Sequence, residues 1–488
     1  IIIETLLFSL YKITGAKYFE NNFELRKRFD VIRPFDNPEY FNELNSSSTK
    51  IAIFGGSSSN GHGVVVNFGE YIKNLYPEKF IVHNYAKNGA PFVKFQSELL
   101  NIVAPYYDIL IVYAGHNEIW SHLYMKSYGK DEKIKLFNGY IIDGKKIRLS
   151  HNIEKLLLQK LIKSQNKLYF SILNSRLLNF YKQTVRFINK KFLKKLENKK
   201  INNNEKNPLF IHAPVISNSE KKEITSKYLK TIDEIILRLN LNQKLIISTV
   251  LSNDLYPPNI DVVKKNNYEY YNTIFSNIYK KIKNDEIISS SIISSLPFGA
   301  YKTFVEANNC VLKSEKTQSN WKHCKELLSK ARTLDALPYR VIEDINTEIR
   351  QLKNEKVIVV DPANKLPSKK KEYLGYFLDF QHPSTKGHFL IADEIIKALS
   401  LPEKNINLNT EIINKKCGRF SWCDVSNNFN KNCLKNKEDN YKNYINSLNE
   451  NFYWLEKQIK KTSLPHLHKY YLEEIKSLMK MCKINATN

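Results

Sequence analysis

The stretch Lys50-Ile51-Ala52-Ile53-Phe54-Gly55-Gly56-Ser57 decides the fold, because an apolar run closes on two glycines and a serine. Short apolar runs that end at glycine are typical of buried strands that pass into a tight turn. Two more such strands are predicted, over Phe80–Ala86 ahead of Asn88-Gly89 and over Asp108–Ala114 ahead of Gly115-His116-Asn117-Glu118.

Helical patterns lie between these strands, over about 63–75 and 91–103, the second with Pro91 in its first turn. Alternating strands and helices predict an α/β fold of the doubly wound type. In such sheets ligands bind beyond the carboxyl ends of the strands, where Ser57, Gly89 and Asn117 all fall.

Later strands are predicted over Lys244–Val250 and Val357–Asp361, and a last core helix over Thr385–Leu399. The core is therefore expected to be discontinuous, formed by about 49–121, 244–259 and 355–401. Helical insertions are expected over about 123–241 and 260–350. A domain over 45–402 would lie between an N-terminal segment, 1–44, and a helical cysteine-containing extension, 403–488.

Ser57 follows two glycines at a strand end, where small neighbours allow a tight turn and the approach of a carbonyl group. A turn serine or a helix cap explains the same residue. The turn lacks the lysine of a phosphate-binding loop and the G-x-G-x-x-G spacing, so nucleotide binding is not expected.

Gly89 could donate its backbone N–H to a developing oxyanion, or could simply form a turn. Asn117 ends a buried strand, where packing does not call for a polar group, and one amide donor lowers an acyl-transfer barrier by about 3 kcal/mol. Asp379 precedes His382 by three residues just before a helix, so the carboxylate can orient the imidazole. The alternative is a capping aspartate beside a surface histidine.

Together these residues resemble the SGNH hydrolase superfamily of GDSL-type esterases and lipases. The resemblance implies a flavodoxin-like α/β/α sandwich with a parallel sheet, no metal and no cofactor. It also implies a catalytic triad of Ser57, His382 and Asp379, with oxyanion donors from Ser57, Gly89 and Asn117. The aspartate usual before the serine is replaced by Gly56, which weakens the GDSL label.

The details are similar to a bacterial subgroup with Gly-His-Asn-Glu strand ends, often fused to tetratricopeptide-like helices. Its counterparts here include the loop at Ser252-Asn253 and the segment Ala331–Arg340, and the helix pair within Ala300–Ala331 would be a vestige of the repeat. His116, Glu118, Asn253 and Arg340 are candidate substrate-binding residues. His116 and Glu118 could instead support their loop, and Arg340 could instead cap a helix or pair with Asp335.

The chain of 488 residues has 42% hydrophobic residues, which predicts a globular protein. Its net charge of +26 comes from 75 Lys+Arg against 49 Asp+Glu. Positive charge can attract a polyanion, but lysine is abundant throughout and no arginine-rich patch with interleaved aromatics stands out. A compositional bias explains the charge better, and a nucleic-acid partner is not expected.

Six cysteines occur without a C-x-x-C motif, and three of them fall within Cys417–Cys433. They predict disulfides and an extracytoplasmic location, periplasmic or in the cell envelope, with free thiols in the cytoplasm as the alternative. The apolar start Ile1–Leu10 is either the end of a truncated membrane anchor or an amphipathic helix. The basic stretch Arg176–Leu196 could lie on a membrane or a partner, although a solvated helix packed on the core explains it better.

The sequence therefore predicts a serine esterase that removes acetyl or short acyl groups from a small molecule, glycan or lipid, such as one of the cell envelope. An O-acyltransferase would use the same residues and pass the acyl group to a sugar hydroxyl. A binding or scaffold protein with an inactive site is the third alternative. The acyl chain, the acceptor and the oligomeric state are not encoded in any pattern that we recognise.

Overall fold

A computed structural model of the chain describes residues 34–36, 39–61, 67–123, 133–135, 141–143, 155–156, 159–163, 216–258, 268–317, 321–336, 338–377 and 380–402. The chain divides into two compact units, the first comprising 1–47, 127–134 and 141–212 and the second the remainder. The first contains the short helices η2 (Pro34–Asp36) and α3 (Tyr40–Leu44). A separate two-stranded sheet pairs β4 (Lys133–Lys135) with β5 (Ile141–Asp143).

The second unit is built on a parallel five-stranded sheet with the strand order β2-β1-β3-β6-β7. Its strands are β1 (Thr49–Gly55), β2 (Phe80–Asn84), β3 (Ile109–Tyr113), β6 (Lys244–Ser248) and β7 (Val357–Val360). When these five strands are numbered 1 to 5 along the chain, their order in the sheet is 2-1-3-4-5, which is the order of flavodoxin-like sheets. The predicted α/β fold with a parallel sheet is confirmed.

The strands lie where the apolar runs predicted them, and the three central strands β1, β3 and β6 are buried on both faces, whereas the edge strands β2 and β7 are partly exposed. All five residues of β3 are buried, and Ile51–Phe54 of β1 have no exposed surface. A parallel sheet needs this pattern, since helices cover both of its faces. In register, Ile51 of β1 is the partner of Ile109, and Gly55 is the partner of Tyr113.

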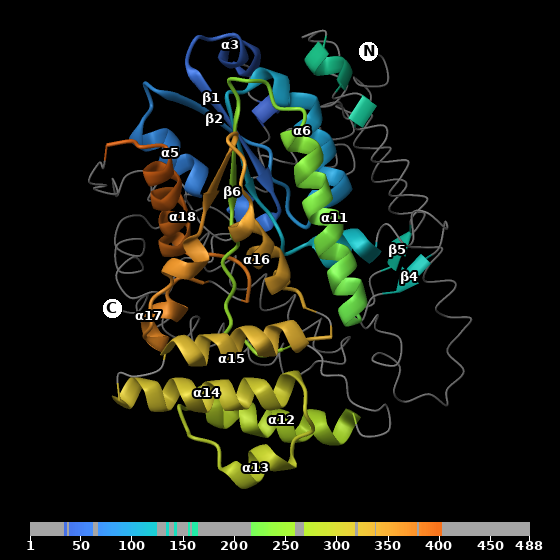
Figure 1. Cartoon of the computed structure of the whole chain (residues 1–488), viewed down its shortest axis with the longest axis vertical. Coiled ribbons are helices and arrows are strands. Elements are labelled where there is room, and N and C mark those ends of the chain that lie inside the picture. Colours follow the sequence, from blue (N-terminus) through green and yellow to red (C-terminus); the bar gives the residue numbers. More distant parts are fainter. Residues whose placement is uncertain are drawn as a thin grey trace, which may run out of the picture. The chain divides into compact units, whose positions relative to one another are not determined.

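Helices form a layer on each side of the sheet (Figure 1). One layer contains α5 (Phe68–Leu75) and α18 (Thr385–Ala398), and the other contains α6 (Ser97–Val103), α11 (Asn218–Ile236) and α16 (Glu343–Gln351). The sequence placed α11 and α16 in insertions, but they are the helices that connect β3 to β6 and β6 to β7. Both helices contain few apolar residues, because only a narrow stripe of each helix is buried.

The helix starts follow ordinary capping chemistry. Asn67 begins α5, and Ser217 begins α11, each in a capping box with a glutamate three residues later. Ser384 begins α18 by accepting a hydrogen bond from the Gly387 N–H. These caps fix where each loop at the edge of the sheet ends.

The predicted helix over Pro91–Val103 is only partly present. Residues Phe92–Gln96 (η3) form an irregular turn in which Lys94 has a φ of 77°, and α6 begins at Ser97. Pro91 itself has an extended backbone. The turn is held by polar groups that follow β3, as described below.

Four helices form a separate layer past the lower end of the sheet in Figure 1. They are α12 (Tyr268–Lys283), α13 (Ser290–Ser295), α14 (Ala300–Thr317) and α15 (Trp321–Leu334). A disulfide joins Cys310 of α14 to Cys324 of α15, with the two Cα atoms 5.4 Å apart. The predicted pair of helices within 300–331 is therefore present and cross-linked.

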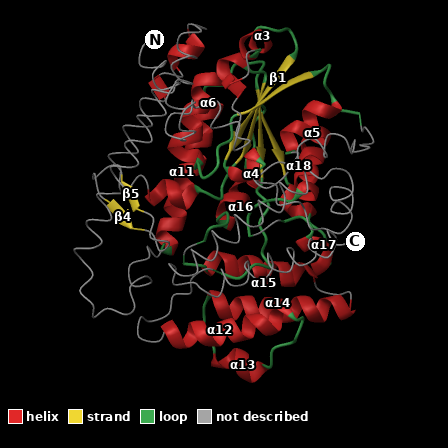
Figure 2. Ribbon diagram, turned by 180° about the vertical axis from the view of Figure 1, so that it is seen from behind, coloured by secondary structure: helices red, strands yellow, loops and turns green. Residues whose placement is uncertain are grey.

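The strand order reverses between β1 and β3, and in doubly wound folds the ligand crevice opens there. The four-residue helix α4 (Ser57–Asn60) follows β1 directly at this edge (Figure 2). Shorter elements of the second unit are η4 (Ala104–Tyr106), which precedes β3, and η6 (Pro362–Lys365) and α17 (Lys370–Leu374), which follow β7.

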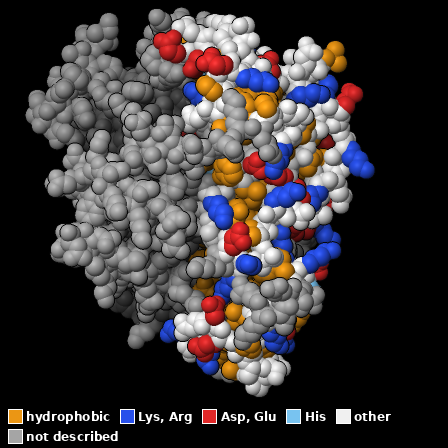
Figure 3. Space-filling view, turned by 90° about the vertical axis from the view of Figure 1, so that its left-hand side faces the viewer, with side chains coloured by type: hydrophobic (Ala, Val, Ile, Leu, Met, Phe, Trp, Pro, Cys, Tyr) orange, Lys and Arg blue, Asp and Glu red, His pale blue; other side chains and the backbone are white. Residues whose placement is uncertain are grey.

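Several predictions concern residues outside those that the structure describes. They are the N-terminal anchor, the stretch Arg176–Leu196 and the extension 403–488 with its four cysteines. Among the described residues, no helix is both long enough and apolar enough to cross a membrane. Basic and acidic side chains are mixed over the described part of the face in Figure 3, as a general compositional bias predicts.

Candidate functional site

The structure brings Ser57 and His382 into hydrogen-bond contact. Nε2 of His382 lies 2.8 Å from Oγ of Ser57, and both side chains are more than nine-tenths buried. A serine hydroxyl in contact with an imidazole nitrogen is the pairing that activates a serine as a nucleophile. Asp379, predicted to orient the imidazole, lies outside the described residues.

Ser57 occupies the first position of α4, directly beyond the two glycines. A Cβ on Gly55 would lie 2.2 Å from the carbonyl oxygen of Tyr113, and one on Gly56 would lie 2.3 Å from Nδ2 of Asn117. Only glycine therefore lets the chain turn this close to β3 and its loop. Glycine at position 56, where the resemblance implied aspartate, lets Asn117 lie against the turn that carries Ser57.

The next two serines hold the turn in place. Oγ of Ser58 donates to the carbonyl of Gln381, 3.1 Å away, and Oγ of Ser59 donates to the carbonyl of Tyr113. The first of these bonds joins the Ser57 turn to the loop that carries His382. This bond therefore helps to fix the position of Ser57 relative to His382.

The His382 loop is also held from the strand β6 side. The backbone N–H of Asn253 donates to the carbonyl of Phe380, with the two atoms 3.2 Å apart. Past the histidine, Ser384 begins α18 and its hydroxyl donates to the carbonyl of Gly375, 2.6 Å away. His382 therefore lies between two fixed points that are four residues apart.

Asn117 and Gly89 lie on the loops that adjoin the nucleophile. Nδ2 of Asn117 donates to the carbonyl of Ala90, 3.1 Å away, and the amide has a second N–H. Gly89 has a φ of 70°, is exposed and would have open space around an added Cβ. Asn117 thus joins the two loops that were predicted to supply oxyanion donors.

Glu118 joins the loop after β3 to the turn at Phe92–Gln96 by hydrogen bonds. Its carboxylate accepts the backbone N–H groups of Phe92 (2.7 Å) and Val93 (3.2 Å), and Oγ of Ser121 donates to the Val93 carbonyl (3.0 Å). Burial raises the pKa of Glu118 to about 7, against the opposing effect of the two backbone hydrogen bonds. Glu118, with 1% of its surface exposed, supports the loop, which is one of the two roles that the sequence left open.

His116 and Arg340 also bind loops. Nδ1 of His116 accepts the backbone N–H of Val341, 3.0 Å away. The Arg340 guanidinium is 2% exposed, and its Nη1 donates to the carbonyls of Asn253 and Tyr256, each 2.8 Å away. Nη2 of Arg340 also lies 3.9 Å from Asp335, so the alternative of pairing with Asp335 is present.

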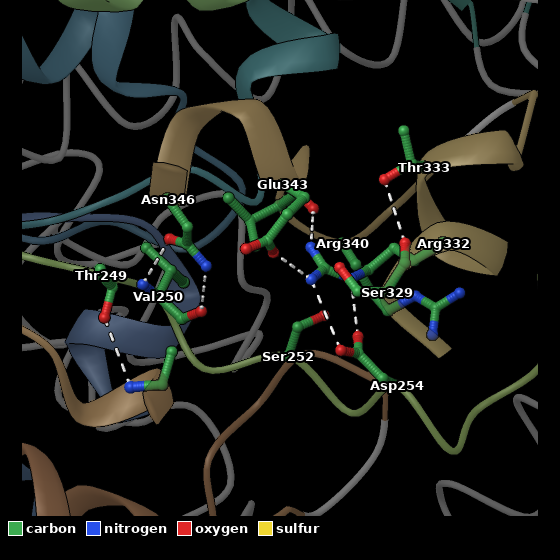
Figure 4. A network of polar contacts seen from close by, with 12 residues as sticks. Thr249, Val250, Ser252, Asp254, Ser329, Arg332, Thr333, Arg340, Glu343 and Asn346 are labelled. Carbon is green, nitrogen blue, oxygen red and sulfur yellow. Dashed lines mark hydrogen bonds and ion pairs between the residues drawn. The ribbon is translucent and has the colours of Figure 1, made fainter. Parts of the chain in front are cut away.

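A buried ionic network that the sequence analysis did not find lies behind the Asn253 loop (Figure 4). Nε of Arg332 on α15 lies 2.6 Å from Oδ1 of Asp254, and its Nη2 lies 2.5 Å from Oε2 of Glu343 on α16. Glu343 also pairs with Arg350, which in turn pairs with Asp361. The network attaches the helical layer to the loops of the α/β sheet.

The network could not be recognised from the sequence, because Asp254 and Glu343 are 78 and 11 residues from Arg332 and no local pattern links them. The one signal in the sequence was the position of Arg332 among the apolar residues of the buried face of α15. Tyr373 was missed for the same reason: its hydroxyl donates to the Ser252 carbonyl at 2.7 Å and accepts the Asp254 N–H at 3.2 Å.

Among the described residues, no group of three or more His, Cys, Asp or Glu side chains is arranged to hold a metal ion. No family model matches the chain, and no curated protein matches it. One solved structure that it is similar to is that of a gut microbial diltiazem-metabolizing enzyme, at 10% identity and a TM-score of 0.27. The match covers 72% of this chain and 47% of that protein, about half its length.

Proposed function

We propose that this protein is a serine esterase of the SGNH type that hydrolyses carboxylic esters with an acetyl or short acyl group. The contact between Ser57 Oγ and His382 Nε2, at 2.8 Å, carries the proposal. The contact joins a serine at a strand-to-helix turn to a histidine before the last helix. Both lie at the carboxyl edge of the sheet, where doubly wound folds bind ligands.

The chemistry follows from this pair. Ser57 Oγ attacks the ester carbonyl carbon while His382 Nε2 accepts the hydroxyl proton. The resulting C–O⁻ is stabilised by N–H donors, for which Asn117 Nδ2 and the backbone N–H groups of Ser57 and Gly89 are the candidates. His382 then gives its proton to the leaving alcohol oxygen as the ester C–O bond breaks. This leaves the acyl group on Ser57.

Water completes the cycle. His382 accepts a proton from a water molecule that attacks the acyl carbon, and a second oxyanion collapses to release the carboxylic acid. The proton returns from His382 to Ser57 Oγ. Every step uses groups of this chain and water, and each bond formed is matched by one broken.

The test is turnover of p-nitrophenyl acetate together with labelling by a fluorophosphonate probe, which reacts with activated serines. The wild-type protein is expected to do both, and Ser57→Ala is expected to do neither. His382→Ala is expected to lower both rates by at least about 10³, the usual cost of removing a triad member.

Ser58→Ala is the matched control, because it removes the neighbouring hydroxyl and its bond to Gln381 while leaving the nucleophile. It is expected to retain labelling, because the contacts of Asn253 with Phe380 and of Ser384 with Gly375 still hold the His382 loop. A folded wild-type protein that neither labels nor turns over would contradict the proposal and favour a binding protein with an inactive site.

A further inference from the structure

Arg340 binds the backbone of a turn that follows strand β6. Its Nη1 donates to the carbonyl oxygens of Asn253 and Tyr256, each 2.8 Å away, and the Tyr256 N–H donates to the same Asn253 carbonyl at 3.1 Å. Figure 4 shows Arg340 beside the loop that carries Ser252 and Asp254. A single guanidinium nitrogen therefore joins the first and last residues of the turn 253–256.

The two residues that Arg340 joins are the ones that hold Phe380. The backbone N–H of Asn253 donates to the carbonyl oxygen of Phe380, 3.2 Å away. The ring of Tyr256 packs on the ring of Phe380, with the two centroids 5.4 Å apart. The turn thus contacts Phe380 through both its backbone and its side chain, and Arg340 fixes the spacing of these two contacts.

Phe380 lies two residues before His382, in the same loop. The next carbonyl along this loop, that of Gln381, accepts the hydrogen bond from Oγ of Ser58. Consecutive carbonyl groups of the loop are therefore held from two sides, one by the turn 253–256 and one by the turn that carries Ser57. His382 follows directly, with Nε2 at 2.8 Å from Oγ of Ser57.

The guanidinium of Arg340 is engaged by the protein itself. Both N–H groups of Nη1 are used by the two carbonyls, and Nη2 lies 3.9 Å from the carboxylate of Asp335, a residue with no exposed surface. Burial of a charged group is costly unless it is paired and hydrogen-bonded, and hydrogen bonds from a charged donor are the stronger ones. These contacts favour a role in holding the turn over the binding of a substrate anion.

We propose that Arg340 is a positioning residue for His382, which acts through the turn 253–256 and Phe380 to keep the imidazole in place against Ser57. The inference rests on the proposed esterase function. It adds to the catalytic pair a residue that contacts neither member of it.

The position of the imidazole matters because His382 moves a proton in every step of the proposed reaction. Proton transfer requires the two heavy atoms to lie within hydrogen-bond reach. A displacement of about 1 Å can lower a rate about a hundredfold. Loosening of the His382 loop is therefore expected to lower kcat, whereas KM should change little because the substrate does not contact Arg340.

The test measures kcat and KM for p-nitrophenyl acetate at a temperature at which circular dichroism shows each protein to be folded. Arg340→Met removes the donors and keeps an unbranched chain. Arg340→Lys restores one charged nitrogen, which is sufficient for both bonds because Nη1 alone makes them. Asp335→Asn is the matched control, since it changes the other partner of Arg340 and leaves both carbonyl bonds in place.

Arg340→Met is expected to lower kcat about 10- to 100-fold and to leave KM within about twofold of the wild-type value. Arg340→Lys should recover most of the lost kcat, and Asp335→Asn should keep the wild-type kcat. The double variant of Arg340→Met with Asp335→Asn should show the same fall in kcat. It decides the result if Arg340→Met does not fold, because it leaves no buried carboxylate without its partner.

A wild-type kcat in folded Arg340→Met or in the double variant would overturn the positioning role. A loss that appears in KM alone would also overturn it and would assign Arg340 to substrate binding. Equal losses in Arg340→Lys and Arg340→Met would show that the hydrogen bonds are not the cause, which overturns it as well. Absence of Ser57-dependent turnover by the wild-type protein is a separate result, which would overturn the esterase function and this inference with it.

Discussion

Ser57 and His382 are separated by 325 positions in the chain, yet Oγ of Ser57 lies 2.8 Å from Nε2 of His382. Three contacts from other loops maintain this arrangement: Ser58 with Gln381, Asn253 with Phe380, and the Ser384 cap of α18. The pair is therefore positioned by the parallel sheet and its loops, and not by local sequence. The predictions below concern buried groups elsewhere in the same unit and the disulfide of the helical layer.

Glu118 is expected to make stability fall as the pH rises. Its folded-state pKa of about 7 lies above the ordinary value of 4.5, because burial penalises the carboxylate. The folded protein therefore holds a proton that the unfolded chain has lost, and this contribution is present below pH 4.5 and lost on rising through pH 7. The loss amounts to about 3 kcal/mol.

Urea unfolding at pH 4.5 and pH 8, with Glu118→Gln as the comparison, measures this effect. The neutral variant should lack that part of the pH dependence, so the stability difference between the two proteins should change by about 3 kcal/mol across the range. Parallel pH profiles would show that Glu118 does not titrate in this window.

His388 is expected to make the stability of the protein fall as the pH falls. It is fully buried, its Nδ1 accepts the Phe68 N–H at 3.3 Å, and burial and the neighbouring His382 lower its pKa to about 3. A lowered folded-state pKa gives stability that is present above pH 6.5 and is lost as the pH falls toward 3, with about 3 kcal/mol gone by pH 4.

The matched variant is His388→Asn, since an amide oxygen can accept the same N–H without titrating. It should unfold at a lower pH than the wild-type protein when both are followed by acid titration. If the two acid transitions coincide, His388 is not the group responsible.

The ion pair between Arg332 and Asp254 should show strong coupling. Arg332→Met leaves a buried carboxylate without its partner and is expected to cost about 3–5 kcal/mol of unfolding free energy. The double variant with Asp254→Asn should cost about 2 kcal/mol less than the sum of the two single changes. If urea unfolding shows that the losses of unfolding free energy in the two single variants simply add up in the double variant, the interaction between Arg332 and Asp254 does not stabilise the protein.

Removal of the Cys310–Cys324 disulfide should destabilise the α14–α15 pair. The bond closes a loop with a sequence separation of 14, and a loop of that size stabilises a protein by about 3 kcal/mol. Cys310→Ser with Cys324→Ser should therefore lower the melting temperature, and non-reduced peptide mapping should show the two cysteines linked in the wild-type protein. Alkylation of both as free thiols would contradict the assignment.

The sequence predicted the strands well because burial on both faces leaves an apolar run such as Ile109–Tyr113, which needs no tertiary information. It failed for α11 and α16, whose exposed faces make their composition resemble that of an insertion. It also failed at Pro91, because Glu118, 26 residues after Phe92, holds that segment out of a helix.

The sequence located Ser57 and Asn117 just beyond the ends of β1 and β3 and His382 just before the last helix, and the structure has them there. For Glu118 and Arg340 the sequence left a supporting role and substrate binding open, because a buried charged side chain that binds backbone groups has the same sequence signature as one that binds a ligand.

The central claim is that Ser57 is an activated nucleophile, and its most direct test is to locate the residue that a fluorophosphonate modifies. Ser57, Ser58 and Ser59 are consecutive, and fragmentation of the labelled peptide can distinguish them. We expect phosphonylation of Ser57 alone in the wild-type protein and no phosphonylation in His382→Ala. Modification of Ser58, Ser59 or a serine elsewhere, or no modification of the folded protein, would contradict it.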